Sequence, residues 1–309
     1  MSRYSLWKNH LSKKFGERFI DSISVSEVKD YLNMLYYKEN RAYRYVESFL
    51  KMFYLLFGQA YSRNYLDVDI YNTFCVNKNT KLHMPKMKID EEKDIIAYSN
   101  AEMTELDEYF KGTNAETAYL LGKYCGLRIG ECYGLKWSNI DFKHECIQIE
   151  HQMQYQNGII KLTPLKTRNA RRTIYMNSKL KEHLHKIKQE RDKFASENKQ
   201  VITQNQTIIS DINNKPLSSF ELVNSSSNGK IQTVNSMKYH SNKIRQLLGI
   251  QFKYHHLRHT FGTRLADQGI PTHLLCNQMG HSSGRVTEKY YIAISKNGTD
   301  IIKNTVENI

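Results

Sequence analysis

Residues 254–265 read YHHLRHTFGTRL, a stretch in which histidines and arginines recur at the spacing of one helical turn. Side chains three or four positions apart lie on the same face of a helix. His255, Arg258 and His259 therefore share one face, which brings two imidazoles and a guanidinium together. Imidazoles transfer protons and a guanidinium binds anions, so this helix is a candidate part of a reactive site.

Two further basic segments precede this helix. Residues 125–137 read CGLRIGECYGLKW, and Arg128 and Glu131 lie one helical turn apart, as a surface ion pair at a helix start also would. Residues 163–172 read TPLKTRNARR and fall between two predicted strands. A solvated hairpin turn explains such charges too, but the flexible stem of Lys166 can also reach a neighbouring site and protonate a leaving oxygen.

A fourth segment, residues 278–291, reads QMGHSSGRVTEKYY and contributes His281, Tyr290 and Tyr291. Together the four segments supply arginines, histidines, a lysine and a tyrosine, with no cluster of carboxylates. This inventory suits a phosphodiester, because an arginine donates paired hydrogen bonds to its non-bridging oxygens. A tyrosine hydroxyl, with a pKa of about 10 in peptides, needs a base or a cationic field to attack phosphorus.

The hydrophobic pattern predicts a mainly α-helical chain with a small antiparallel β-sheet, an α+β fold. Apolar residues recur every three or four positions over residues 2–75, and Ser24 followed by Glu27 is typical of a helix start. The period changes to two between residues 145 and 176, where Asn157-Gly158 is a strong hairpin signal. We expect strands near residues 147–149, 159–162 and 172–175, helices from Ser99, over 117–126, over 178–195 and from Val234, and a loop over 196–230.

A polar, lysine-rich stretch divides the chain into two core-forming parts. It contains Pro85 and shows no sustained periodicity, which is typical of a linker. A length of 309 residues also favours about two domains. We therefore expect a helical domain over residues 1–78, a linker over 79–98 and a second domain over 99–309.

The chain is strongly basic, with 45 Lys and Arg against 31 Asp and Glu and a formal net charge of +14. Such an excess causes self-repulsion unless a polyanion neutralises it, so nucleic acid is the leading partner. No stretch approaches the ~18 apolar residues of a membrane span, and the first ten residues lack a secretory signal. We expect a cytoplasmic protein with no membrane partner. The five cysteines, never spaced as CxxC, argue against a disulfide framework and a cysteine-rich zinc module.

Taken together, the four segments resemble those of the tyrosine recombinase family, the integrases of phages and conjugative elements and the Xer-type resolvases. GLRIGE resembles the family's first arginine box, HHLRHTFGT its H-x-x-R box, MGHSS its Gly-His box and TEKYY its nucleophile segment. The resemblance covers roughly residues 100–295, and residues 2–75 look like the family's core-binding domain. It implies that this domain and a catalytic domain form a C-shaped clamp on DNA. The implied function is integration and excision of a mobile genetic element by strand exchange through a 3′-phosphotyrosyl intermediate.

The resemblance also implies a role for each residue that matches a family motif. Arg128 and Arg258 would clamp the scissile phosphate, and His281 would form a hydrogen bond with it. Lys166 would act as the general acid. His255 would assist proton transfer.

Tyr290 would be the nucleophile, because it lies nine residues after His281 (290 minus 281), a common spacing in the family. Tyr291 is the alternative, since some integrases place the nucleophile one residue later. Glu131 would orient the site residues without contacting the substrate. The predicted catalytic residues are Arg128, Lys166, His255, Arg258, His281 and Tyr290.

The same resemblance implies no cofactor and no metal, because the bond to tyrosine conserves the energy of the phosphodiester. The expected partners are double-stranded DNA at recombination core sites and accessory DNA-bending or directionality proteins. The protein would be monomeric in solution, tetrameric in the synaptic complex and nucleoid-associated when bound to DNA. Apolar positions within residues 292–309 would allow this tail to pack on a neighbouring protomer or on its own domain.

Three other functions compete with recombination. His255, His259 and His281 have a spacing that metal ligands can also have, but the glutamate of a zinc hydrolase is missing and Arg258 would repel a dication. A catalytically silent DNA-binding protein would not need the lysine and tyrosine where they stand. A type IB topoisomerase shares the chemistry. Nothing here resembles the N-terminal arm-binding domain of many integrases, which leaves open a simple Xer-like layout or a longer natural protein.

Overall fold

The computed structural model describes residues 3–88, 96–156, 159–165, 168–198, 209–211, 213, 215–226, 229–281, 284, 287–288 and 290. Lys166, Tyr291, the turn Asn157-Gly158 and the tail 292–309 lie outside the described residues. Within the described part, no helix has both the length and the apolar character that a bilayer span requires. The chain divides into two compact units, Met1–Lys93 and Asp94–Ile309.

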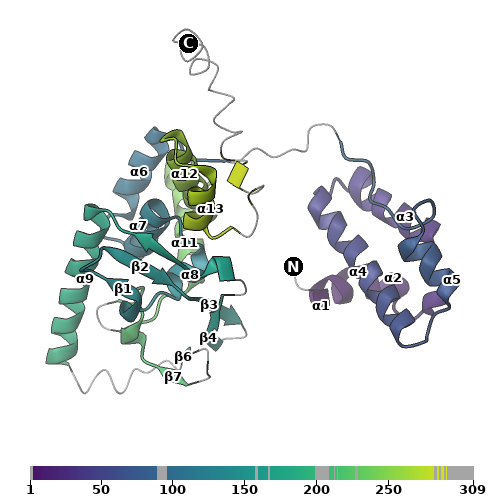
Figure 1. Ribbon diagram of the computed structural model, residues 1–309, viewed down its shortest axis with the longest axis horizontal. Coiled ribbons are helices and arrows are strands. Elements are labelled where there is room, and N and C mark those ends of the chain that lie inside the picture. Colours follow the sequence, from purple (N-terminus) through teal and green to yellow (C-terminus); the bar gives the residue numbers. More distant parts are fainter. Residues whose placement is uncertain are drawn as a thin grey trace, which may run out of the picture. The chain divides into compact units, whose positions relative to one another are not determined.

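The first unit is a group of packed helices (Figure 1). Aromatic side chains contribute much of its core. The rings of Phe57 and Phe74 stack at 3.6 Å between centroids, and both side chains are buried. The Ser24 hydroxyl accepts a hydrogen bond from the backbone N–H of Glu27 at 3.2 Å, so the predicted helix start is confirmed. The α-helices are α1 (Arg3–Leu6), α2 (Ser12–Phe15), α3 (Val25–Asn33), α4 (Tyr43–Ser62) and α5 (Val68–Tyr71), with π-helical segments at Trp7–Leu11, Met34–Lys38 and Asn72–Val76 and a 3₁₀ turn at Ile20–Ser22.

The first unit continues into the segment 79–98, where we expected the linker. The Tyr37 hydroxyl donates to the carbonyl oxygen of Lys86 at 2.8 Å. The backbone N–H of Lys88 donates to the Tyr36 hydroxyl at 2.8 Å. Two tyrosines thus bind the backbone of a segment whose composition alone is typical of a loop.

The second unit combines helices with two small sheets (Figure 1). The three predicted strands are present. The strand Ile159–Pro164, which follows the predicted hairpin turn, pairs antiparallel with an additional strand that was not predicted, His151–Gln156, with His151 opposite Pro164. Sheet order is β1-β2-β5 in one sheet and β3-β4-β6-β7 in the other, and β4 and β6 are parallel. The strands are β1 (Ile140–Asp141), β2 (Cys146–Ile149), β3 (His151–Gln156), β4 (Ile159–Pro164), β5 (Arg172–Tyr175), β6 (Ile209–Ser210) and β7 (Pro216–Leu217).

The structure corrects two expectations about these sheets. We expected one antiparallel sheet, and the described residues form two, one of which contains a parallel pair. We also expected residues 196–230 to be a loop, but β6 and β7 lie in this range. Each of these strands has two residues, which is too short for a hydrophobic period to show in the sequence.

Helices of the second unit pack against both sheets, α8 on β3 and α13 on β5, and they bring distant segments together. Ser99 and Glu102 form a capping box at the start of α6, where we expected a helix to begin. Helix α7 ends at Gly126, whose φ of +59° is a left-handed conformation that glycine adopts without strain. Helix α12 packs on α7 and lies beside α13 (Figure 1). The helices are α6 (Asn100–Phe110), α7 (Glu116–Cys125), α8 (Ile129–Tyr133), α9 (Ser178–Glu197), α11 (Val234–Leu248), α12 (Tyr254–Asp267) and α13 (Thr272–Met279), with 3₁₀ turns at Trp137–Asn139, Arg168–Ala170 and Ser219–Glu221.

Candidate active site

Arg258 occupies the buried face of α12, with 1% of the residue exposed. One of its terminal nitrogens donates to the carbonyl oxygen of Gly126 at 2.7 Å, and the other donates to that of Met279. Burial, followed by the positive charges of Arg128 and Arg172, lowers the pKa of Arg258 to about 9. The guanidinium still carries its charge at neutral pH, in surroundings where a bound anion would stabilise it strongly.

Arg128 and Arg172 both bind the carboxylate of Glu131, whose side chain is fully buried. The Arg128 guanidinium donates to one carboxylate oxygen at 2.8 Å, and its backbone N–H donates to the other at 2.9 Å. The Arg172 guanidinium donates to both oxygens, at 2.9 and 3.1 Å. Burial by itself raises the pKa of Glu131, but the hydrogen bonds and charge of Arg172, together with Arg128, lower it to about 2. One ionised carboxylate therefore orients two guanidinium groups.

The three arginines converge on three successive carbonyl oxygens at the end of α13. Arg172 donates to the oxygen of Gln278 at 3.0 Å, Arg258 to that of Met279, and Arg128 to that of Gly280 at 3.1 Å. The last carbonyls of a helix lack partners within it and carry partial negative charge, so they attract cations. The end of α13 thus gathers three positive groups at one place. The side chain of Arg128 remains 37% exposed, which leaves it accessible to a ligand.

Tyr290 lies beside this positive cluster and is almost completely buried, with 2% exposed. Its hydroxyl oxygen is 3.0 Å from Nδ1 of His259. Burial raises the pKa of the Tyr290 hydroxyl, and the charges of Arg258 and Arg128 counteract part of that rise. The hydroxyl is therefore protonated at neutral pH, and a base is needed to make it a nucleophile.

His281 follows the end of α13 and packs against the same tyrosine. Its ring lies nearly parallel to that of Tyr290, with 6.0 Å between centroids. Its Nδ1 is 2.9 Å from the hydroxyl of Thr287. Burial, followed by the charges of Arg258 and Arg128, lowers the pKa of His281 to about 3. The ring is neutral at pH 7 and is held by a buried hydrogen bond.

The fold brings together four of the six residues that the sequence analysis placed in the site. They come from the start of α8, the buried face of α12, the residue that follows the C-terminal cap of α13, and the last residue that the structure describes. The charges of the two arginines reach both the histidine and the tyrosine. These residues are Arg128, Arg258, His281 and Tyr290.

The other predicted residues are not part of this group in the described structure. His255 is exposed on α12, and its imidazole makes no hydrogen bond with the described residues. Its ring contacts that of His259 edge to face, with 4.5 Å between centroids. Lys166 and Tyr291 lie outside the described residues.

Two residues that contact the site were not assigned a role from the sequence. Arg172 was grouped with the charges of a hairpin turn. It lies two positions before Ile174 in β5, and side chains two apart share a face of a strand. Ile174 is fully buried. An arginine on the same strand face as a core isoleucine therefore indicates a buried guanidinium. His259 was identified on the helical face, but its contact with Tyr290 spans 31 positions and leaves no local pattern.

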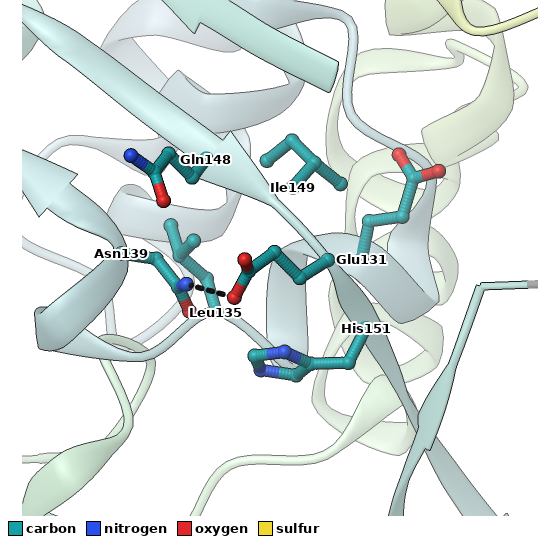
Figure 2. Close-up of a pocket in the computed structure, with 7 residues that line it drawn as sticks. Glu131, Leu135, Asn139, Gln148, Ile149 and His151 are labelled. Atoms are coloured by element: carbon teal, nitrogen blue, oxygen red, sulfur yellow. Dashed lines mark hydrogen bonds between the residues drawn. The ribbon is translucent and has the colours of Figure 1, made fainter. Parts of the chain in front are cut away.

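A small pocket is lined in part by Glu131, the carboxylate that binds Arg128 and Arg172 (Figure 2). In it the Asn139 amide donates to the Glu150 carboxylate at 2.9 Å. None of the arginines or Tyr290 lines it. Among the described residues, no group of three or more His, Cys, Asp or Glu side chains could hold a metal ion. The pocket is lined by Glu131, Leu135, Asn139, Gln148, Ile149, Glu150 and His151.

Solved structures share the fold. The Tn1549 transposon integrase in complex with transposon right end DNA aligns with 94% of this chain and 87% of its own, with a TM-score of 0.70 and 19% identity. The λ integrase dimer bound to a COC′ core site aligns with 94% of this chain and 86% of its own, with a TM-score of 0.58 and 16% identity.

Sequence comparison assigns the family. A tyrosine recombinase XerC-like protein of Caldanaerobacter subterraneus subsp. tengcongensis is 27% identical over 317 residues, which cover 96% of this chain and 74% of that protein. The transposase from transposon Tn916 of Enterococcus faecalis is 26% identical over 288 residues, which cover 90% of this chain and 65% of the transposase. The model of the phage integrase family matches residues 87–297, more than half of the chain. The chain therefore belongs to the phage integrase family, the tyrosine-type site-specific recombinases.

Proposed function

We propose that this recombinase cuts and rejoins DNA through a 3′-phosphotyrosyl link to Tyr290. The observation that carries the proposal is the position of the Tyr290 hydroxyl, which lies in the positive field of Arg258 and Arg128 and contacts an imidazole. A phosphodiester held by the two guanidinium groups would lie next to the nucleophile. Charge that develops on the phosphate oxygens during attack would be stabilised by groups already in place.

Each residue of the predicted set has a role in this reaction. The tyrosine oxygen attacks phosphorus, the bond from phosphorus to the 5′ oxygen breaks, and the leaving oxygen takes a proton from Lys166. His281 forms a hydrogen bond with the phosphate, and His255 assists proton transfer. The tyrosyl ester is then attacked by the 5′ hydroxyl of the partner strand, which restores the DNA without ATP or a metal ion.

The proposed substrate is double-stranded DNA at the core sites of a mobile genetic element. The net charge of +14 suits a polyanion. The similarity to the transposase from transposon Tn916 supports an origin on a mobile element. We further propose that the two units close on the duplex as a clamp and that four protomers form the synaptic complex, with a monomer in solution. Accessory proteins would bias integration or excision, and the reaction would take place in the cytoplasm on the nucleoid.

Covalent capture tests this proposal. The full chain is incubated in EDTA with nicked duplex fragments from its source genome, denatured in SDS, and freed of unattached DNA. We expect a specific duplex to remain bound through a peptide that contains Tyr290, because a transesterification survives denaturation whereas binding does not. Retention of DNA only under native conditions would instead indicate a silent DNA-binding protein, and cleavage that requires a divalent ion would indicate a metal hydrolase.

Gly262 should be required for the position of the nucleophile. A Cβ atom at this position would lie 2.8 Å from Cε1 of Tyr290, closer than carbon atoms pack, so Gly262→Ala must displace the ring. We expect cleavage to fall by about 10²-fold, the effect of a misplacement on the order of 1 Å. The measurement is the rate of adduct formation on the captured duplex.

Gly58→Ala is the matched control for this variant. Gly58 lies in α4, and an added Cβ has no heavy atom within 4 Å. We expect unchanged cleavage and a gain of about 0.5–1 kcal/mol in the stability of that helix. Cleavage by Gly262→Ala at the wild-type rate would show that the reaction does not depend on the packing of Gly262 against the Tyr290 ring.

A further inference from the structure

The hydroxyl of Tyr290 contacts the imidazole of His259, which is not among the predicted catalytic residues. Nδ1 of His259 lies 3.0 Å from the hydroxyl oxygen, which is within the range for direct proton transfer. The two rings are 5.8 Å apart between centroids and inclined by 44°. Within the described residues, this is the one hydrogen bond of the proposed nucleophile.

We propose that His259 is the general base that takes the phenolic proton of Tyr290 when its oxygen attacks phosphorus. The inference rests on the proposed role of Tyr290. His255, to which proton transfer was assigned, is exposed one turn earlier on α12 and contacts His259 rather than Tyr290. The geometry therefore places His259 between the predicted histidine and the nucleophile.

The surroundings of His259 keep its ring neutral and able to accept a proton. Burial, followed by the charges of His255, His256 and Arg258 on the same helix, lowers the pKa of His259 to about 4. From other elements, Tyr290 and His281 face it. A neutral imidazole that accepts at Nδ1 carries its proton on Nε2.

Binding of DNA is expected to raise the pKa of His259, which favours its action as a base. The scissile phosphate brings negative charge beside Arg258, whose positive charge disfavours protonation of His259. The pKa of His259 therefore rises when substrate binds, which strengthens the base. After rejoining, the phenol is free again and the imidazolium has returned its proton.

The proposed step balances in atoms and charge. As the bond between the tyrosine oxygen and phosphorus forms, the phenolic proton passes to Nδ1 of His259. As the bond from phosphorus to the 5′ oxygen breaks, the leaving oxygen takes a proton from the general acid, Lys166 in our proposal. In the rejoining step, an incoming 5′ hydroxyl loses its proton to that acid, and His259 protonates the departing tyrosine oxygen.

His259→Asn tests the role of the base, because asparagine keeps a polar group near Nδ1 but cannot take up a proton. We expect cleavage of the captured duplex to fall by about 10²–10⁴-fold. His273→Asn is the matched control: this histidine is exposed on α13 and should leave cleavage unchanged. Cleavage by His259→Asn at the wild-type rate would overturn the proposal.

A duplex with sulfur in place of the bridging 5′ oxygen distinguishes the role of a general base from that of a general acid. A thiolate leaves without a proton, since thiols have a pKa of about 8.5, so loss of the general acid is rescued on this substrate. We expect the sulfur to restore cleavage by Lys166→Ala but not by His259→Asn. Equal rescue of both variants would assign His259 to the leaving group and overturn its role as base.

Nitrogen NMR of histidine-labelled protein tests the same inference without DNA. The signal of His259 is the one among 12 histidines that His259→Asn removes. We expect Nδ1 without a proton at pH 7 and a pKa below the ordinary 6.5. A proton on Nδ1 would overturn the inference, because Nδ1 would then donate to the tyrosine.

The capture experiment separates failure of the proposed function from failure of this inference. If no duplex forms an adduct, the proposed function fails. If Tyr290 forms the adduct but His259→Asn cleaves normally, only the inference about His259 fails.

Discussion

Tyr290→Phe is expected to remove the covalent protein–DNA adduct completely, while DNA binding and folding stay close to wild type. The substitution deletes one atom, the hydroxyl oxygen that would attack phosphorus. The ring that packs on Gly262 and lies parallel to His281 remains. The lost hydrogen bond to His259 has a net contribution of about 1 kcal/mol, too little to unfold the unit. The adduct is measured on a denaturing gel, with binding by gel shift and stability by thermal unfolding.

Tyr291→Phe is the matched variant for this experiment. It removes the same atom one residue later and is expected to keep the adduct. Loss of the adduct in Tyr291→Phe and its persistence in Tyr290→Phe would move the nucleophile by one residue. It would also leave the contact between His259 and Tyr290 without a catalytic purpose.

Glu131→Gln is expected to lower the free energy of unfolding of the second unit by about 3–5 kcal/mol, the usual cost of removing one partner of a buried ion pair. The carboxylate is fully buried and binds both Arg128 and Arg172. Without its charge, two guanidinium groups remain close to each other and to Arg258. Cleavage should fall as well, since the phosphate clamp loses the group that orients it. Thermal or denaturant unfolding of the full chain measures the first effect.

Glu47→Gln provides the control for an exposed pair. Glu47 lies 2.8 Å from Lys51 on the surface of α4, and such pairs contribute about 0.3–0.5 kcal/mol. A loss of similar size in both variants would contradict the role given to Glu131.

Acid should remove the contribution of ionised Glu131 to the free energy of unfolding in a defined pH range. The pKa of this carboxyl is lowered from an ordinary 4.5 to about 2 in the folded chain. A lowered pKa in the folded state stabilises the fold fully above pH 4.5, and this contribution is lost as the pH falls toward 2. The difference in unfolding free energy between wild type and Glu131→Gln should therefore shrink below pH 4.5. A difference that stays constant from pH 7 to pH 3 would show that the carboxylate charge does not contribute.

Much of the local structure could be predicted because it depends on neighbours in the sequence. The helix starts at Ser24 and Ser99 follow from a hydroxyl that reaches an N–H three residues on. The presence of β4 follows from the hairpin signal just before it in the sequence. The segment 79–98 was less predictable, because two tyrosines from elsewhere in the unit bind its backbone.

Motif spacing and hydrophobic period are local properties, so the residue types of the candidate site, and most of the helices and strands that carry them, could be predicted from the sequence. Which of these groups act on one another depends on packing between distant parts of the chain. The carbonyls at the end of α13 collect arginines from three other elements, and Glu131 becomes the partner of Arg172 rather than of Arg128 alone. His259, and not His255, contacts Tyr290. These contacts join positions far apart in the chain. Burial next to the other charged groups sets both the charge state and the geometry of each side chain.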